Sequence, residues 1–206
     1  MATAVRNVEA PTDRTSLPLI LRLRPVVELS DDQLLALSSL NRDLRIERNA
    51  EGELLLMPPA GGATGGRNAE ITRQVGNWAK TDGTSTAFDS STGFRLPNGA
   101  VRSPDAAWVL RPRLEAISPE EREKFLPLCP DFVIGLRSFS DTLRDVQAKL
   151  EEYLTNGARL GWLIDPYSKH LYVYRPGAAV ETLENPKRVF GDPLLPGFVL
   201  DLREVW

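Results

Sequence analysis

Residues 131–165, DFVIGLRSFSDTLRDVQAKLEEYLTNGARLGWLID, decide the fold of this chain. DFVIGLR and LGWLID are short apolar runs with the length and composition of buried strands. Between them, residues 141–158 place apolar side chains at helical spacing and end at Asn156-Gly157, a helix stop signal. A helix that connects two such strands is a crossover, so we predict that the two strands are parallel neighbours in one sheet.

Gly135 lies in the middle of the first of these strands. A glycine there weakens a strand and contributes no packing. A β-bulge or the close approach of another backbone explains such a glycine, and so does the loss of a side chain that once had a function. The strand by itself leaves all three explanations open.

The rest of the chain predicts hairpins and helices around this unit. Ser30 and Gln33 form a capping-box pattern that starts a helix over 31–41. The residues 58–68, PPAGGATGGRN, are rich in glycine and predict a flexible connection, followed by a helix from 69 to about 81. Strands are predicted at 44–48, 53–58, 86–96, 101–110, 170–176, 178–184 and 198–206, and a short helix at 118–125.

These elements predict an α/β (α+β) fold with a mixed β-sheet flanked by helices. Residues 1–17 are polar and predict a loose tail, so a single domain is expected over 18–206. No apolar run approaches the roughly 20 residues of a membrane span. The single cysteine, Cys129, and single histidine, His170, argue against a disulfide framework and a structural zinc site, and fit a reducing cytoplasm.

The charged residues give mixed signals about nucleic acid. The net charge of −3 argues against tight nonspecific binding. The 25 basic residues include twenty arginines and only five lysines, a ratio that suits bidentate phosphate contacts but also fits a compositional bias. GGATGGRN lacks the Gly-Lys-Ser/Thr ending of a P-loop, although backbone amides at the start of the following helix can still hold a phosphate.

Several motifs in order resemble the PD-(D/E)XK superfamily, the restriction-endonuclease-like fold, and within it a widespread bacterial family of predicted endonucleases. The motifs are GELLLMPPAGG, NAEI, DSSTGFRLPNGAVRSPDAAWV, CPDFVIGLRSFSD, KLEEYLTNGARLGWLIDP, VYRPG and LPGFVLDL. The resemblance covers the chain from about residue 34 to residue 206. It implies an N-terminal helix and hairpin and C-terminal strands added to the nuclease core.

The resemblance also implies site residues. Asp105 matches the aspartate of the PD motif, and Lys149 matches the family's lysine, which lies on the helix. Glu70 matches the acid of the first core helix, and Asp145 and Tyr153 accompany the lysine. Magnesium or manganese is the implied cofactor, DNA the implied substrate and a homodimer the implied assembly.

The chain departs from this pattern at Gly135, where relatives carry the second metal-binding carboxylate. Asp105, Glu70 and the backbone carbonyl of Leu136 are then the expected metal ligands. The favoured hypothesis is a Mg²⁺-dependent DNA endonuclease whose activity is impaired by Gly135. The alternatives are a catalytically inactive, nuclease-derived protein that binds nucleic acid or a partner, and a structural dimer.

Overall fold

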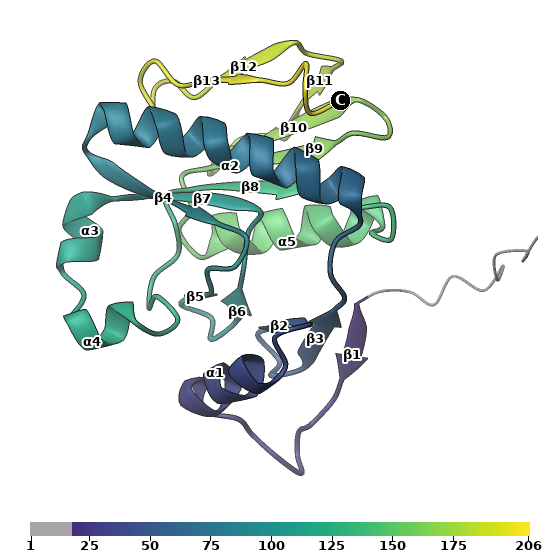
Figure 1. Ribbon diagram of the computed structural model, residues 1–206, viewed down its shortest axis with the longest axis vertical. Coiled ribbons are helices and arrows are strands. Elements are labelled where there is room, and N and C mark those ends of the chain that lie inside the picture. The colour runs from purple at the N-terminus through teal and green to yellow at the C-terminus, as the bar shows by residue number, and fades with distance from the viewer. Residues whose placement is uncertain (1–17) are drawn as a thin grey trace, which may run out of the picture.

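A computed structural model describes residues 18–206, so the tail expected at 1–17 lies outside the described residues. Its largest sheet has six strands in the order β11-β10-β9-β8-β7-β4. Helices cover both faces of this sheet (Figure 1). The strands are β4 Ser85–Asp89, β7 Ala106–Leu110, β8 Phe132–Leu136, β9 Leu160–Asp165, β10 His170–Tyr174 and β11 Glu181–Glu184.

The crossover predicted at 131–165 is confirmed. β8 and β9 are parallel, whereas the other neighbours in this sheet are antiparallel, so the sheet is mixed. The connecting helix α5, Leu143–Thr155, starts at Thr142, whose side chain accepts from the Asp145 amide. It ends before Gly157, which has a φ of 110° that favours glycine.

The glycine-rich segment was predicted wrongly. The helix α2, Gly62–Asp82, starts inside it, so GATGGRN is helical rather than a flexible connection. Glycines cost a helix roughly 1 kcal/mol each relative to alanine, but packing against the sheet can override that preference. Ile71 and Val75 on α2 are fully buried and supply this packing.

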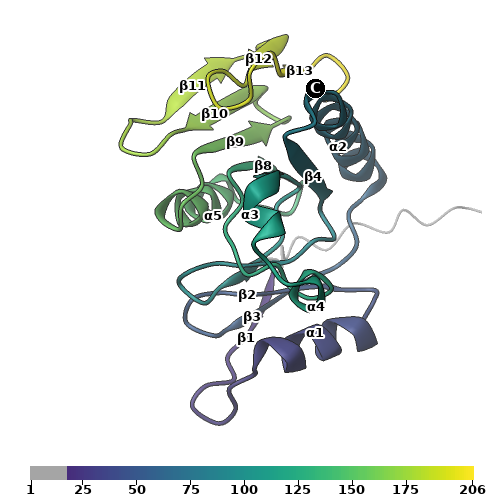
Figure 2. The same ribbon diagram turned by 90° about the vertical axis from the view of Figure 1, so that its left-hand side faces the viewer.

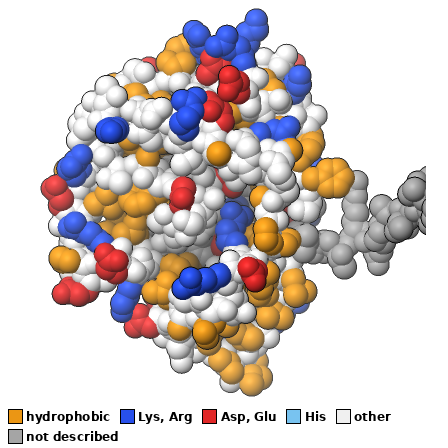
Figure 3. All heavy atoms as spheres, viewed as in Figure 1, with side chains coloured by type: hydrophobic (Ala, Val, Ile, Leu, Met, Phe, Trp, Pro, Cys, Tyr) orange, Lys and Arg blue, Asp and Glu red, His pale blue; other side chains and the backbone are white. Residues whose placement is uncertain are grey.

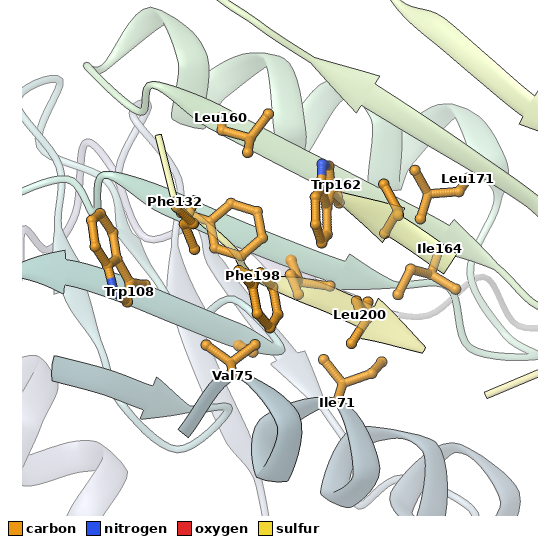
Figure 4. Packing of buried hydrophobic residues seen from close by; sticks show 14 of the residues in the cluster. Ile71, Val75, Trp108, Phe132, Leu160, Trp162, Ile164, Leu171, Phe198 and Leu200 are labelled. Carbon is orange, nitrogen blue, oxygen red and sulfur yellow. The ribbon is translucent and has the colours of Figure 1, made fainter. Parts of the chain in front are cut away.

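Two hydrophobic clusters lie on opposite faces of the six-stranded sheet. The first lies beneath α2 and has an aromatic centre, in which the Trp162 and Phe198 rings stack with centroids 5.8 Å apart (Figure 4). Phe132 meets Trp162 edge to face at 4.9 Å. The second cluster includes Leu150 of α5, Val133 and Leu163. Burial on both faces explains why the central strands read as continuous apolar runs.

The N-terminal part forms a second sheet, ordered β1-β3-β2-β6-β5, below the first (Figures 1 and 2). Its strands are β1 Leu19–Leu21, β2 Arg45–Arg48, β3 Leu54–Met57, β5 Phe94–Arg95 and β6 Val101–Arg102. The helix α1, Asp31–Leu40, begins with the predicted capping box at Ser30 and Gln33. The strands predicted at 44–48 and 53–58 contain β2 and β3, which pair as an antiparallel hairpin.

The long strands predicted at 86–96 and 101–110 are each divided between the two sheets. The first contains β4 and β5, and the second contains β6 and β7. The divisions fall at residues 90–93 and 103–105, which contain the turn-forming residues that the run of apolar positions obscured. Both sheets therefore share the segment around Asp105.

Shorter elements complete the chain. The predicted short helix is α4, Pro119–Arg122, whereas α3, Arg111–Glu115, was not predicted. The C-terminal region forms a separate pair of antiparallel strands, β12 Arg188–Phe190 and β13 Val199–Asp201, of which only β13 was predicted. Cys129 is buried, and burial raises the pKa of its thiol to about 12. Within residues 18–206, no helix combines the length and apolar character that a membrane span requires.

One ionic cluster joins the two large sheets. Glu47 of β2 is 2% exposed and accepts from Lys149 Nζ at 2.6 Å and from the Ser103 amide at 3.1 Å. Arg102 Nη1 approaches the other carboxylate oxygen at 3.3 Å. Because α5 packs on the six-stranded sheet, the Glu47–Lys149 pair connects that sheet to β2 of the other.

We expect Glu47→Gln to lower the free energy of unfolding by roughly 3–5 kcal/mol, the usual cost of removing one partner of a buried ion pair. Urea unfolding at pH 7 measures the change. Glu184→Gln, on the exposed face of β11, is the matched control and should stay within about 0.5 kcal/mol of the parent. Equal losses in the two variants would show that the buried cluster does not join the sheets.

The same cluster predicts acid sensitivity. Burial raises the pKa of Glu47, but Lys149, Arg45 and Arg102 outweigh burial and hold that pKa at about 2, against an ordinary 4.5. A carboxyl group whose pKa is lowered by folding contributes stability above its unfolded pKa and loses it as the pH falls through the folded pKa. The parent should therefore lose stability between pH 4.5 and 2 more steeply than Glu47→Gln does, in urea titrations at stepped pH.

Candidate functional site

The site begins where β7 and β8 meet. Ala106 pairs with Ile134 in the antiparallel register, so one further step along both strands leads to Asp105 and Gly135. The Asp105 amide donates to the Ile134 carbonyl at 2.9 Å. The Leu136 amide donates to Asp105 Oδ2 at 2.7 Å. The structure therefore brings Asp105 and Gly135 side by side, and Leu136 contacts Asp105 through its amide.

Lys149 reaches the same region from α5. Its ammonium donates to Glu47 Oε1 at 2.6 Å and to the Ser103 carbonyl at 3.0 Å, two residues before Asp105. Its side chain is 22% exposed. The lysine is thus fixed between the two sheets, beside the strand that carries the aspartate.

Glu47 is a residue of this site that sequence reasoning missed. In the strand RIER an alternation of apolar and charged residues suggests one buried and one solvated face. In fact both faces of β2 are covered: Ile46 packs with Leu34 and Leu54, while Glu47 is buried against Lys149 and Arg102. No feature of the sequence distinguishes Glu47 from a surface carboxylate, because its partners are 55 and 102 residues away.

Electrostatics single out the lysine among the cations of the cluster. Burial lowers the pKa of Lys149, the neighbouring Arg45 and Arg102 lower it further, and Glu47 only partly compensates. The arginines keep their protons because their ordinary pKa is far higher. Lys149 is therefore the cation of the cluster from which a proton is most easily removed.

Glu70 lies elsewhere. Its carboxylate accepts from Arg73 at 2.5 and 2.8 Å and from Gln74 at 2.8 Å, and it lines a hollow between α2 and β13. The side chain of α2 that contacts Asp105 is Asn68, whose Nδ2 donates to Oδ1 at 3.1 Å. Two residues along a helix correspond to about 200°, so Asn68 and Glu70 point in nearly opposite directions.

Asp145 and Tyr153, the two residues expected beside Lys149, differ in burial: the first is exposed and the second is buried. Asp145 is exposed and bonds to Thr142, so it belongs to the start of α5. Tyr153 is 1% exposed, and its hydroxyl has no hydrogen-bond partner within residues 18–206. Burial raises the pKa of Tyr153 well above 10, and Glu47 raises it further. Tyr153 is therefore a neutral phenol within the second hydrophobic cluster.

Packing at Gly135 is tighter than its lack of a side chain suggests. A Cβ there would lie 2.9 Å from Leu150 Cδ2 and 3.6 Å from Leu163 Cδ1. The other methyl group of Leu150 lies 3.0 Å from the corresponding position at Gly161. The φ of Gly135 is not positive, so its backbone conformation tolerates a side chain. A side chain at this position therefore requires the Leu150 Cδ2 methyl group, the end of its side chain, to shift.

The donor set fits a weakly held, hydrated divalent ion. Mg²⁺ is commonly bound through one or two carboxylates, with water and substrate phosphates completing its shell. Asp105 supplies one carboxylate at the candidate site, and each of its oxygens already accepts one bond, from Asn68 and from the Leu136 amide. Both oxygens of the buried Glu47 also accept bonds from protein donors. Within residues 18–206, no group of three or more His, Cys, Asp or Glu residues is placed to hold a metal.

A groove of about 1100 Å³ opens onto Asp105. Figure 3 shows basic side chains, with acidic ones beside them, in a hollow near the middle of one face. Both sheets and the start of α2 contribute to the groove. Among its lining residues are Arg42, Arg45, Arg67, Asn68 and Ser103. Asp105 therefore faces a space large enough for a segment of a polymeric substrate.

Comparisons with known proteins agree with this architecture. None of the curated proteins matches the chain. A solved structure described as a putative nuclease belonging to DUF820, from Anabaena variabilis, is similar with a TM-score of 0.66 and 21% identity. The similarity covers 78% of this chain and 88% of that one. It supports the restriction-endonuclease-like fold predicted from the sequence.

Membership of a family follows from a separate comparison of the sequence. The model of the family Uma2, described as putative restriction endonuclease, matches residues 31–203. The match includes the segments that carry Glu47, Asp105, Gly135 and Lys149. The chain belongs to the Uma2 family of putative restriction endonucleases.

Proposed function

We propose that the chain is a DNA endonuclease that uses Mg²⁺ or Mn²⁺, with its site at Asp105 and Lys149 and its activity lowered by Gly135. One observation carries the proposal. The Asp105 carboxylate lines the groove, and the Lys149 ammonium bonds to the carbonyl of Ser103, two residues before Asp105. Family membership supports nuclease chemistry in general, and the finer assignment rests on this geometry.

The residues have distinct parts in this proposal. Asp105 provides the carboxylate that a divalent ion needs, and the ion, when bound, supplies an activated water and neutralises phosphate charge. An ammonium has three N–H donors, and Lys149 uses two of them on Glu47 and Ser103. The third can orient a water or a phosphate oxygen, as charge stabilisation during hydrolysis requires.

Binding of nucleic acid without cleavage is the second candidate. The specific observation that favours it is the position of Leu150, which fills the space where a carboxylate side chain at position 135 would begin. A site without a carboxylate at position 135 keeps the groove but binds a metal ion weakly. Cleavage and binding assays separate the two candidates.

A plasmid-nicking assay tests the first candidate. We expect slow nicking of supercoiled DNA that requires millimolar Mg²⁺ or Mn²⁺ and is lost in EDTA. Asp105→Asn and Lys149→Met should each lower the rate by at least about 100-fold, since they remove groups in contact with the ion or the reacting phosphate. Asp145→Asn, an exposed carboxylate on the helix that carries Lys149, is the control and should retain activity. Absence of nicking at every metal concentration would refute the endonuclease proposal.

A second prediction concerns Gly135. We expect both Gly135→Ala and Gly135→Glu to destabilise the fold by roughly 1–3 kcal/mol, because Leu150 must move. Leu150→Val should relieve part of this cost by removing the methyl groups that reach the strand. In the double variant Gly135→Glu/Leu150→Val, nicking should rise at least about tenfold over Leu150→Val alone.

Melting curves with and without Mg²⁺ provide the matching readout. A Mg²⁺ concentration of about 100 times the dissociation constant should stabilise the double variant Gly135→Glu/Leu150→Val by about 2.7 kcal/mol, and Gly135→Ala should show no added shift. If the double variant shows neither a larger Mg²⁺-induced shift nor faster nicking, position 135 does not provide a metal ligand. The glycine is then a packing feature of β8.

A further inference from the structure

We propose that Arg45 is the anion-binding residue of the groove and that it holds a DNA phosphate beside Asp105 without a divalent ion. The inference rests on the proposed function, in which DNA occupies this groove. It adds that binding and metal dependence are separate properties of the chain.

The position of the guanidinium is the first argument. Arg45 Nη1 lies 3.8 Å from Asp105 Oδ1, and Arg45 Nε lies 3.9 Å from Glu47 Oε1. The other terminal nitrogen donates to the sulfur of Met57 at 3.4 Å. Arg45 also lines the groove together with Asp105 and Ser103. The positively charged guanidinium is therefore held at the candidate site by two negatively charged carboxylates.

The hydrogen-bonding capacity of Arg45 is the second argument. Separations of 3.8 and 3.9 Å keep the charges close but exceed the length of an N–H···O hydrogen bond, about 3.2 Å at most. A guanidinium carries five N–H donors in a planar fork whose geometry matches a phosphate. The two carboxylates thus fix the cation in place without using its donors. Apart from the one N–H given to the sulfur of Met57, these donors stay available to a ligand in the groove.

Charge balance is the third argument. The cluster contains three cations and three carboxylates: Arg45, Arg102, Lys149, Glu47, Asp105 and Glu152. It is therefore neutral without a metal, whereas a carboxylate at position 135 would give it one excess negative charge. Among its cations Arg45 has the most exposed side chain, at 36%, against 22% for Lys149 and 11% for Arg102. Arg45 is thus the most accessible cation of the cluster, and of the three it is the one that lines the groove.

The groove itself does not supply a general positive field. Asp43 and Asp141 also line it and oppose the charge of Arg42 and Arg67. A phosphate therefore needs direct contact with a cation at the site, and binding should depend on Arg45 more than on the other arginines of the groove.

Fluorescence anisotropy with a labelled DNA duplex of about 20 base pairs tests the inference, in EDTA and in Ca²⁺, at stepped salt concentrations. The parent should bind with similar affinity in both. Arg45→Gln should weaken binding in EDTA at least about tenfold and make the salt slope shallower by roughly 0.9, as expected when one phosphate fewer is neutralised. Adding Ca²⁺ should restore part of the affinity of this variant, since Asp105 then lacks its neighbouring cation.

Arg42→Gln is the matched control. It removes the same charge from the same groove, but Arg42 is exposed and bonds to the Ser39 carbonyl on α1. Its affinity should fall less than about threefold. Arg45→Lys, which keeps the charge but loses the fork, should weaken binding severalfold and serves if Arg45→Gln does not fold, as judged by melting.

The outcomes separate the inference from the proposed function. DNA binding that requires Ca²⁺ in the parent would overturn the inference alone, as would equal losses in Arg45→Gln and Arg42→Gln. Absence of DNA binding in both EDTA and Ca²⁺ at about 50 mM salt would overturn the proposed function as well. Binding in EDTA that depends on Arg45, with or without nicking in Mg²⁺, supports the inference.

Discussion

The buried carboxylate of Glu47 is the constraint on which the arrangement of the two large sheets depends. Removing a carboxylate from water costs several kcal/mol, and only well-placed cations and donors offset that cost. The donors come from β6, from the Ser103 amide and from α5, and they converge on one side chain of β2. The same contacts hold Lys149 in position. The contacts that join the two sheets are therefore the same contacts that position the lysine, and the second sheet is a structural part of the site.

Neutrality of this cluster has a consequence for the glycine in β8. A second carboxylate beside Asp105 would raise the local negative charge, and a divalent ion would then be needed to balance it. In this chain both electrostatics and packing favour a glycine at position 135. The three positive and three negative charges of the cluster already balance. The two methyl groups of Leu150 lie over Gly135 and Gly161. Gly135 is thus compatible with its surroundings in two independent ways. A bulge is not the explanation for the glycine, because β8 stays in register with β9 from Phe132 to Leu136.

Sequence periodicity predicted the parts of the fold in which local pattern and packing agree. The crossover over 131–165 is such a part, since its strands are buried on both faces and its helix has one apolar face. Prediction failed where tertiary contacts override local preference. The glycines of GATGGRN disfavour a helix, yet the buried face further along α2 extends the helix through them. Strands that pass from one sheet to another, as at residues 103–105, keep an extended apolar pattern that conceals the division.

The site was predictable to the extent that a residue's position follows from its own strand or helix. Asp105, directly before β7, and Lys149 on α5 are in this category. Glu70 is harder to place because side-chain direction on a helix changes by about 100° per residue, and in the structure it is Asn68 of the same helix that contacts Asp105. Glu47 and Arg45 are harder still, since their roles arise from contacts between two sheets. In a strand with two covered faces, a charged residue can be buried only if other strands or helices supply its hydrogen-bond and ion-pair partners. The charges that define such a site therefore belong to the packing of the sheets, and a motif read along one strand does not contain them.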